Sequence, residues 1–158
     1  MPVGTYVYRA PRTMAPHETI RAAAELMERE SIGCVVLVED DRPVGMLTDR
    51  DIALRILGAG LDPSVVRVGE LGRRPPIVIS GQASLGEAIR KMRLHGVRRL
   101  LVVDPAGKLV GLLSADDLLR LLSTEVAELA EALRKQLSGP RAMRESERGA
   151  PARNGGAP

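Results

Sequence analysis

An internal repeat constrains this chain more than any other feature. Residues Thr19–Met27 align with Ser84–Met92 at an offset of 65 residues. Further along, Val44–Ile52 aligns with Val110–Leu118 at an offset of 66 residues, because the turn Asp104–Gly107 of the second copy is one residue longer. Two similar segments in the same order predict that the chain folds as two copies of one structural unit.

The aligned part of each copy begins with a predicted amphipathic helix. Its apolar residues follow the i, i+3, i+4, i+7 spacing of a helix with one buried face. They are Ile20, Ala23, Ala24 and Met27 in the first copy and Leu85, Ala88, Ile89 and Met92 in the second. Thr19 and Ser84 are suited to cap these helices, and Glu87 completes a capping box with Ser84.

Short strands follow each predicted helix. Each copy has two β-branched stretches separated by a polar turn, which is typical of a hairpin. The predicted strands cover residues 35–38 and 44–47 in the first copy and residues 100–103 and 109–113 in the second. The proline-containing segments that lead into the copies, Pro11–Met14 and Pro75–Ile79, are expected to add one more strand to each unit.

A second helix is expected after Thr48 in the first copy and after Ser114 in the second, with Gly58 as the left-handed C′ residue of the first. The pattern predicts a mixed α/β (α+β) fold of two β-α-β-β-α units. One unit of about 60 residues would bury too little apolar surface to be stable alone. We therefore expect the two units to pack sheet against sheet as a pseudo-twofold pair.

The last helix is expected to extend well beyond the corresponding end of the first copy. Its apolar stripe consists of Leu118, Leu122, Val126, Leu129, Leu133 and Leu137. Such a stripe either folds back onto the body or pairs with another subunit. The predicted parts are a first unit with its lead-in segment (1–60), a connection (61–74), a second unit (75–123), a helical extension (124–138) and a disordered tail (139–158).

Composition excludes several classes of protein. The chain has no Trp or Phe and only two Tyr, so it lacks the stacking platforms of single-stranded nucleic-acid binders. The net charge of +3 comes largely from the tail, which argues against a duplex-binding face and against nucleic acid as a partner. No apolar run is long enough for membrane insertion, and no signal peptide is visible. The single cysteine, Cys34, suits a reducing compartment and a buried position, so we expect a cytoplasmic protein.

The residues of the second hairpin and the following helix carry a resemblance to a known family. Val44–Asp51 and Val110–Asp117 resemble the Gly-h-h-[Ser/Thr]-x-x-Asp end of CBS motifs. Gly96–Asp104 is similar to the G-h-R-R-L-P-V-V-D segment of the family, with Leu101 in place of the usual proline. The resemblance covers about residues 7–123 and occurs twice in register. The chain is therefore similar to stand-alone CBS-pair proteins of bacteria and archaea, also called Bateman modules.

The resemblance implies a regulatory module that binds an adenosine-containing ligand between its two repeats. Family members bind AMP, ADP, ATP, S-adenosylmethionine or NAD, often form homodimers, and signal to a regulated enzyme or transporter. The residues that the resemblance marks for ligand binding are Thr48, Arg50, Asp51, Pro76, Ile77, Arg99, Ser114 and Asp117. By this mapping the aspartates bind the ribose hydroxyls, the hydroxyl residues and Arg99 lie near the phosphate, and the lead-in strand meets the adenine.

Elementary chemistry agrees with these roles. A carboxylate can accept charge-assisted hydrogen bonds from both ribose hydroxyls. A hydroxyl residue at a helix start adds its side chain to the free amides there, which suits a phosphate. The position of Arg99 is occupied by Cys34 in the first copy, so the second site is better equipped for phosphate, with Arg50 as a partial substitute in the first.

Other interpretations remain open at this stage. Thr48 with Asp51 and Ser114 with Asp117 also fit helix-capping boxes. His17 and His95 lack companions at metal-ligand spacing, so no metal site is expected. No nucleophile–base pair or glycine-rich phosphate loop is visible, so we expect no enzymatic activity and no required cofactor. The alternative function is a ligand-free adaptor or assembly module that acts through its C-terminal helix.

Overall fold

The computed structural model describes residues 2–6, 10–72 and 74–137. The chain divides into two compact units, Met1–Asp117 and Leu118–Pro158. The elements in chain order are η1 (Val3–Tyr6), β1 (Thr13–Met14), α1 (Ile20–Glu30), β2 (Cys34–Glu39), β3 (Arg42–Thr48), α2 (Asp49–Ile52), η2 (Ala53–Leu57), α3 (Val68–Gly72), β4 (Val78–Ser80), α4 (Leu85–His95), β5 (Arg99–Val103), β6 (Leu109–Ser114) and α5 (Ala115–Leu137). The predicted tail 139–158 lies outside the described residues.

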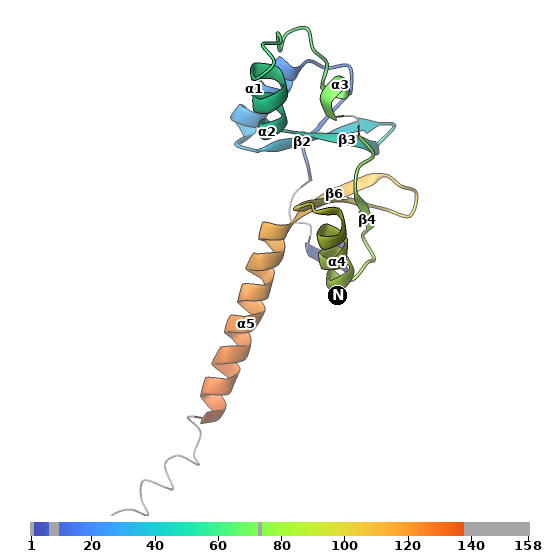
Figure 1. Ribbon diagram of the computed structural model, residues 1–158. Coiled ribbons are helices and arrows are strands. Elements are labelled where there is room, and N and C mark those ends of the chain that lie inside the picture. Colours follow the sequence, from blue (N-terminus) through green and yellow to red (C-terminus); the bar gives the residue numbers. More distant parts are fainter. Residues whose placement is uncertain (1, 7–9, 73, 138–158) are drawn as a thin grey trace, which may run out of the picture. The chain divides into compact units, whose positions relative to one another are not determined.

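Two three-stranded sheets, each with the same topology, confirm the predicted α/β class. Their strand orders are β1-β2-β3 and β4-β5-β6. In each sheet the first strand runs parallel to the central strand, and the last strand runs antiparallel to it. Helices α1, α2 and α3 lie on one side of the sheet that contains β2 and β3 (Figure 1). The β-α-β-β-α order of both units is thus present.

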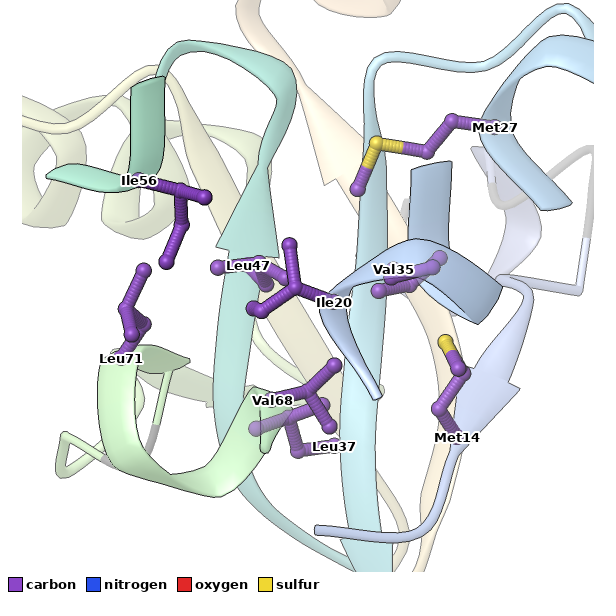
Figure 2. Packing of buried hydrophobic residues seen from close by; sticks show 10 residues of the cluster. Met14, Ile20, Met27, Val35, Leu37, Leu47, Ile56, Val68 and Leu71 are labelled. Carbon is purple, nitrogen blue, oxygen red and sulfur yellow. The ribbon is translucent and has the colours of Figure 1, made fainter. Parts of the chain in front are cut away.

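The core of the first repeat lies between this sheet and its helices. Figure 2 shows Ile20, Val35 and Leu47 packed together from α1, β2 and β3. Helix α3 adds Val68 and Leu71 to the same cluster. Because α3 lies within the segment that the sequence marked only as a connection, that segment completes the first repeat's core as well as joining the two units.

The segments that lead into the two repeats are exchanged between them. The η1 segment before the first repeat binds the second repeat, and α3 before the second repeat binds the first. Four backbone hydrogen bonds connect them: Val3 N to Ala83 O (2.8 Å), Val68 N to Glu18 O (2.8 Å), Gly4 N to Gly81 O (2.9 Å) and Gly69 N to Pro16 O (2.9 Å). Donors and acceptors of the two pairs are each related by the repeat offset of 65 residues. Such reciprocity is what a pseudo-twofold relation between the repeats requires.

This exchange predicts that Gly69→Ala destabilises the fold. A Cβ atom at Gly69 would lie 2.8 Å from the Pro16 carbonyl oxygen and 2.9 Å from the Pro16 Cβ. The resulting displacement costs about 1–3 kcal/mol, which outweighs the gain in helix propensity of at most about 1 kcal/mol. We expect a net loss in the free energy of unfolding, measured by urea titration.

A matched control for Gly69→Ala is Gly86→Ala. Gly86 is exposed in α4, and a Cβ there would meet only the flexible end of Arg90, at 3.4 Å. The same substitution should therefore stabilise the protein by about 0.5–1 kcal/mol through helix propensity. Equal effects of the two substitutions would contradict the close approach at Gly69.

One predicted helix end is wrong. Gly58 was expected to be left-handed, but its φ is −63°, and the left-handed glycine is Gly60 with a φ of 66°. The physical reason is that α2 continues as the π-helical turn η2, in which Gly58 N donates to Ala53 O at 3.2 Å. The wider turn carries the helical backbone through Gly58, so the chain reverses two residues later.

Helix α5 confirms the long C-terminal helix expected from the sequence. It covers 23 residues, with Leu118 buried near its start. Beyond Leu118, the apolar stripe named above is exposed. Across the described part of the chain, no helix is both long and apolar enough to cross a membrane.

Candidate ligand-binding site

The junction between β3 and α2 positions Thr48 and Asp51. Thr48 is the N-cap of α2, and its backbone N donates to Asp51 Oδ2 at 3.0 Å. Its hydroxyl donates to the same oxygen at 2.7 Å and accepts from Asp51 N at 3.1 Å. The capping-box interpretation of this motif is therefore right for the protein's own contacts.

The junction between β6 and α5 repeats this geometry in the second unit. The backbone N of Ser114 donates to Asp117 Oδ2 at 3.1 Å, and the Ser114 hydroxyl donates to the same oxygen. Asp117 N donates back to Ser114 Oγ at 3.1 Å. Within the described residues, Oδ1 of Asp117 accepts no hydrogen bond. The cap fixes the carboxylate and leaves this second oxygen available to a ligand.

The capping box limits what the start of α5 can offer a phosphate. The proton of the Ser114 hydroxyl is donated to Asp117. The amides of Ser114 and Asp117 are used within the box, and the amide of Ala115 donates to the Arg98 carbonyl at 2.9 Å. Only the Asp116 amide is left among the first residues of the helix. A cluster of free amides, expected from sequence, is thus largely consumed by the fold, and an anion here depends on a cation.

Arg99 is the cation closest in register to this junction. It begins β5 and pairs with Ser114 across the antiparallel ladder, so the two side chains point to the same face of the sheet. Arg99 is half-buried, and no carboxylate in the described part of the chain pairs with it. Its neighbour Arg98 is exposed and lies 3.5 Å from Asp116. A partly desolvated guanidinium without an acidic partner favours an anionic ligand.

The segment before β4 lies beside the same end of β5. The carbonyl oxygen of Ile77 accepts from Leu101 N at 3.0 Å, and the parallel register pairs Val78 with Leu101. Continuing this register by two residues brings Pro76 level with Arg99. Pro76 and Ile77 are both half-buried. The sheet therefore aligns the residues predicted for the second repeat, from Pro76 through Arg99 to Ser114 and its partner Asp117.

The first repeat differs at the position equivalent to Arg99. Cys34 pairs with Thr48 in the register, and burial raises the pKa of the Cys34 thiol, with Arg99 acting to lower it and Asp49 to raise it. This position is thus a neutral buried thiol. The effect of Arg99 on Cys34 also means that the second repeat's cation lies near the first repeat's site, which the sequence alone did not reveal.

Arg50 lies on the first turn of α2. Its side chain is exposed, and its backbone N donates to Asp49 Oδ1 at 2.7 Å. Among the residues that the structure describes, no carboxylate forms an ion pair with it. Arg50 can reach an anion only from solvent, whereas Arg99 is held within the sheet.

A search of the sequence for known domains supplies the deciding observation. Residues 3–58 and 68–124 each match the CBS domain. The chain belongs to the CBS-domain family. The two matches contain both aligned copies of the repeat, and they include the exchanged segments η1 and α3, which the sequence reading left outside the units.

Relatives of this CBS pair include stand-alone proteins of known structure. Hypoxic response protein 1 of Mycobacterium tuberculosis is 42% identical over 107 residues, covering 67% of this chain and 74% of that protein. A crystal structure of Hypoxic Response Protein I with two coordinated zinc ions has a TM-score of 0.68, with 36% identity over 76% of this chain and 98% of that one. A CBS domain protein from Pyrobaculum aerophilum complexed with AMP has a TM-score of 0.71, with 30% identity over 81% of this chain and 99% of that one.

Two further features of the CBS pair lie apart from the residues discussed above. Within the described residues, no group of three or more His, Cys, Asp or Glu side chains is placed to hold a metal ion. An open cavity of about 680 Å³ lies in the first repeat, lined by Ala15–His17, Val38–Asp40, Arg67, Gly69 and Glu70. None of the predicted ligand residues lines this cavity, so the two sites are separate.

Proposed function

We propose that this CBS pair is a non-catalytic regulatory module that binds an adenosine-containing ligand at the end of the second sheet. The observation that carries the proposal is Arg99, a half-buried guanidinium without an acidic partner in the described chain, level with Pro76 and Ser114. The AMP bound to the relative from Pyrobaculum aerophilum supports an adenine nucleotide. AMP, ADP or ATP is preferred to S-adenosylmethionine or NAD, because Arg99 suits a terminal phosphate.

Each residue has one role in the proposed second site. The guanidinium of Arg99 binds the phosphate, and Asp117 Oδ1 accepts from the ribose hydroxyls. Ser114 acts on the ligand indirectly, by holding the Asp117 carboxylate in place. Pro76 and Ile77 supply an apolar contact for the adenine, since both are half-buried beside β5.

The first site is proposed to be the weaker of the two. Thr48 and Asp51 reproduce the ribose-binding geometry, but Cys34 replaces the phosphate-binding arginine. Exposed Arg50 is a poorer substitute because solvent screens its charge. In this proposal a cytoplasmic homodimer signals ligand occupancy to a regulated enzyme or transporter, and it needs no cofactor of its own.

The test of the second site is the substitution Arg99→Gln. We expect AMP to bind about tenfold more weakly, because one charge-assisted hydrogen bond to phosphate contributes about 1.5 kcal/mol or more. Adenosine, which lacks the phosphate, should bind Arg99→Gln as it binds the unmodified protein. Isothermal titration calorimetry with both ligands measures the two affinities.

Arg98→Gln is the matched control, because Arg98 is exposed and adjacent in sequence. AMP affinity should be unchanged in this variant. The proposal is contradicted if the two arginine variants lose AMP affinity equally. It is also contradicted if none of AMP, ADP, ATP, S-adenosylmethionine and NAD binds at millimolar concentration, in which case the adaptor function gains support.

A further inference from the structure

The exposed face of α5 is the largest feature that the proposed ligand site does not use. We call the residues Leu119, Leu122, Val126, Leu129 and Leu133 the α5 stripe. Their side chains are between 40% and 66% exposed. Solvent-exposed apolar side chains of this size in one continuous row mark a surface that is covered in the functional protein.

The spacing of the α5 stripe identifies what kind of surface covers it. Successive members are three, four, three and four residues apart, which is the a/d spacing of a coiled coil. A helix that packs on a globular body shows a wider apolar face, whereas a narrow a/d seam fits one other helix. Ala130 and Ala132 flank the seam, and these short side chains allow a partner helix to approach closely.

We propose that the α5 stripe pairs with the same stripe of a second copy of this chain, with the two helices antiparallel. Antiparallel packing places an a residue of one helix opposite a d residue of the other. In this register Leu122 lies opposite Leu133 of the second copy, and Val126 lies opposite Leu129. The stripe is therefore complementary to itself, as a twofold interface requires.

The charges of α5 favour the antiparallel direction. The first turn carries Asp116 and Asp117, and the last turn carries Arg134 and Lys135. In an antiparallel pair each acidic end lies beside the basic end of the other copy, and the helix dipoles are also opposed. A parallel pair would place like charges together at both ends. The interface is independent of the ligand site, since the stripe includes none of the residues proposed to bind AMP.

Leu129→Lys in the full chain tests the interface. We expect the unmodified protein to be a dimer and the variant to dissociate on the order of 100-fold more readily, because the dimer loses two apolar side chains from its seam. Thr124→Lys is the matched control, since Thr124 is exposed on the opposite face of the same helix, and it should remain dimeric. Sedimentation equilibrium measures the dissociation constant, and far-UV circular dichroism checks that α5 stays helical.

Cross-linking tests the direction of the pair. In a Cys34→Ala background, Leu122→Cys and Leu133→Cys chains should form a disulfide when mixed, and neither should do so alone. A monomeric unmodified protein, or a dimer that Leu129→Lys leaves intact, would overturn the interface. Disulfides between identical positions would overturn the antiparallel arrangement. AMP titration of the same variants keeps this test separate from that of the ligand site, because binding should not change.

Discussion

Replacing Asp117 by Ala is expected to weaken AMP binding at least about 100-fold. Asp117 Oδ2 is held by the capping box with Ser114, which leaves Oδ1 to accept from the ribose. Two hydrogen bonds to a charged group contribute about 1.5–3 kcal/mol each, and about 2.7 kcal/mol corresponds to a factor of 100. Isothermal titration calorimetry of AMP against the variant measures the loss.

The effect of Asp117→Ala on binding must be separated from its effect on the helix cap. Ser84 caps α4 by the same kind of box, with Glu87 as its partner, and α4 supplies no proposed ligand residue. Ser84→Ala should therefore cost about 1 kcal/mol of stability and leave AMP affinity unchanged. A fall in AMP affinity in Ser84→Ala would mean that cap loss alone disturbs the site.

The ribose role has its own ligand control. A nucleotide without the 2′ and 3′ hydroxyls cannot donate to Asp117. The affinity of 2′,3′-dideoxy-AMP should therefore be low for the unmodified protein and should change little in Asp117→Ala. If Asp117→Ala weakens AMP and dideoxy-AMP by the same factor, the carboxylate does not bind the ribose hydroxyls.

Replacing Leu47 by Ala is expected to lower the free energy of unfolding by about 3 kcal/mol. Leu47 is fully buried on β3, between α1 and the helical turn that carries Ile56 (Figure 2). Truncating a buried Leu removes its transfer free energy and leaves a cavity, which together cost about 2–5 kcal/mol. Urea unfolding measures the change, with the dependence on urea expected to stay the same.

Leu57→Ala is the matched control for Leu47→Ala. Leu57 belongs to the same repeat but is 71% exposed. The same truncation there should change stability by no more than about 0.5 kcal/mol. Equal losses in the two variants would contradict the placement of the first repeat's core.

The repeat, its strands and its main helices could be predicted from the sequence, whereas η1 and α3 could not. Helix α1 has eleven residues and a capped, one-sided apolar pattern that is visible locally. Segments of four or five residues, such as η1 and α3, are too short to show periodicity. Their fold depends on contacts with residues far away in the chain. A signal was nevertheless present, because Val3-Gly4 recurs as Val68-Gly69 at the repeat offset.

The candidate site divides in the same way. The sequence by itself determined which residues recur, and hence that Asp117 follows a helix start and that Arg99 has Cys34 as its counterpart. Only the tertiary structure decided which of their atoms can meet a ligand. The cap consumes the Ser114 hydroxyl proton and most amides of the helix start, and the sheet register brings Pro76 and Ser114 level with Arg99. Hydrogen bonds use each donor once, so the ligand capacity of a motif depends on the bonds that the fold has already made.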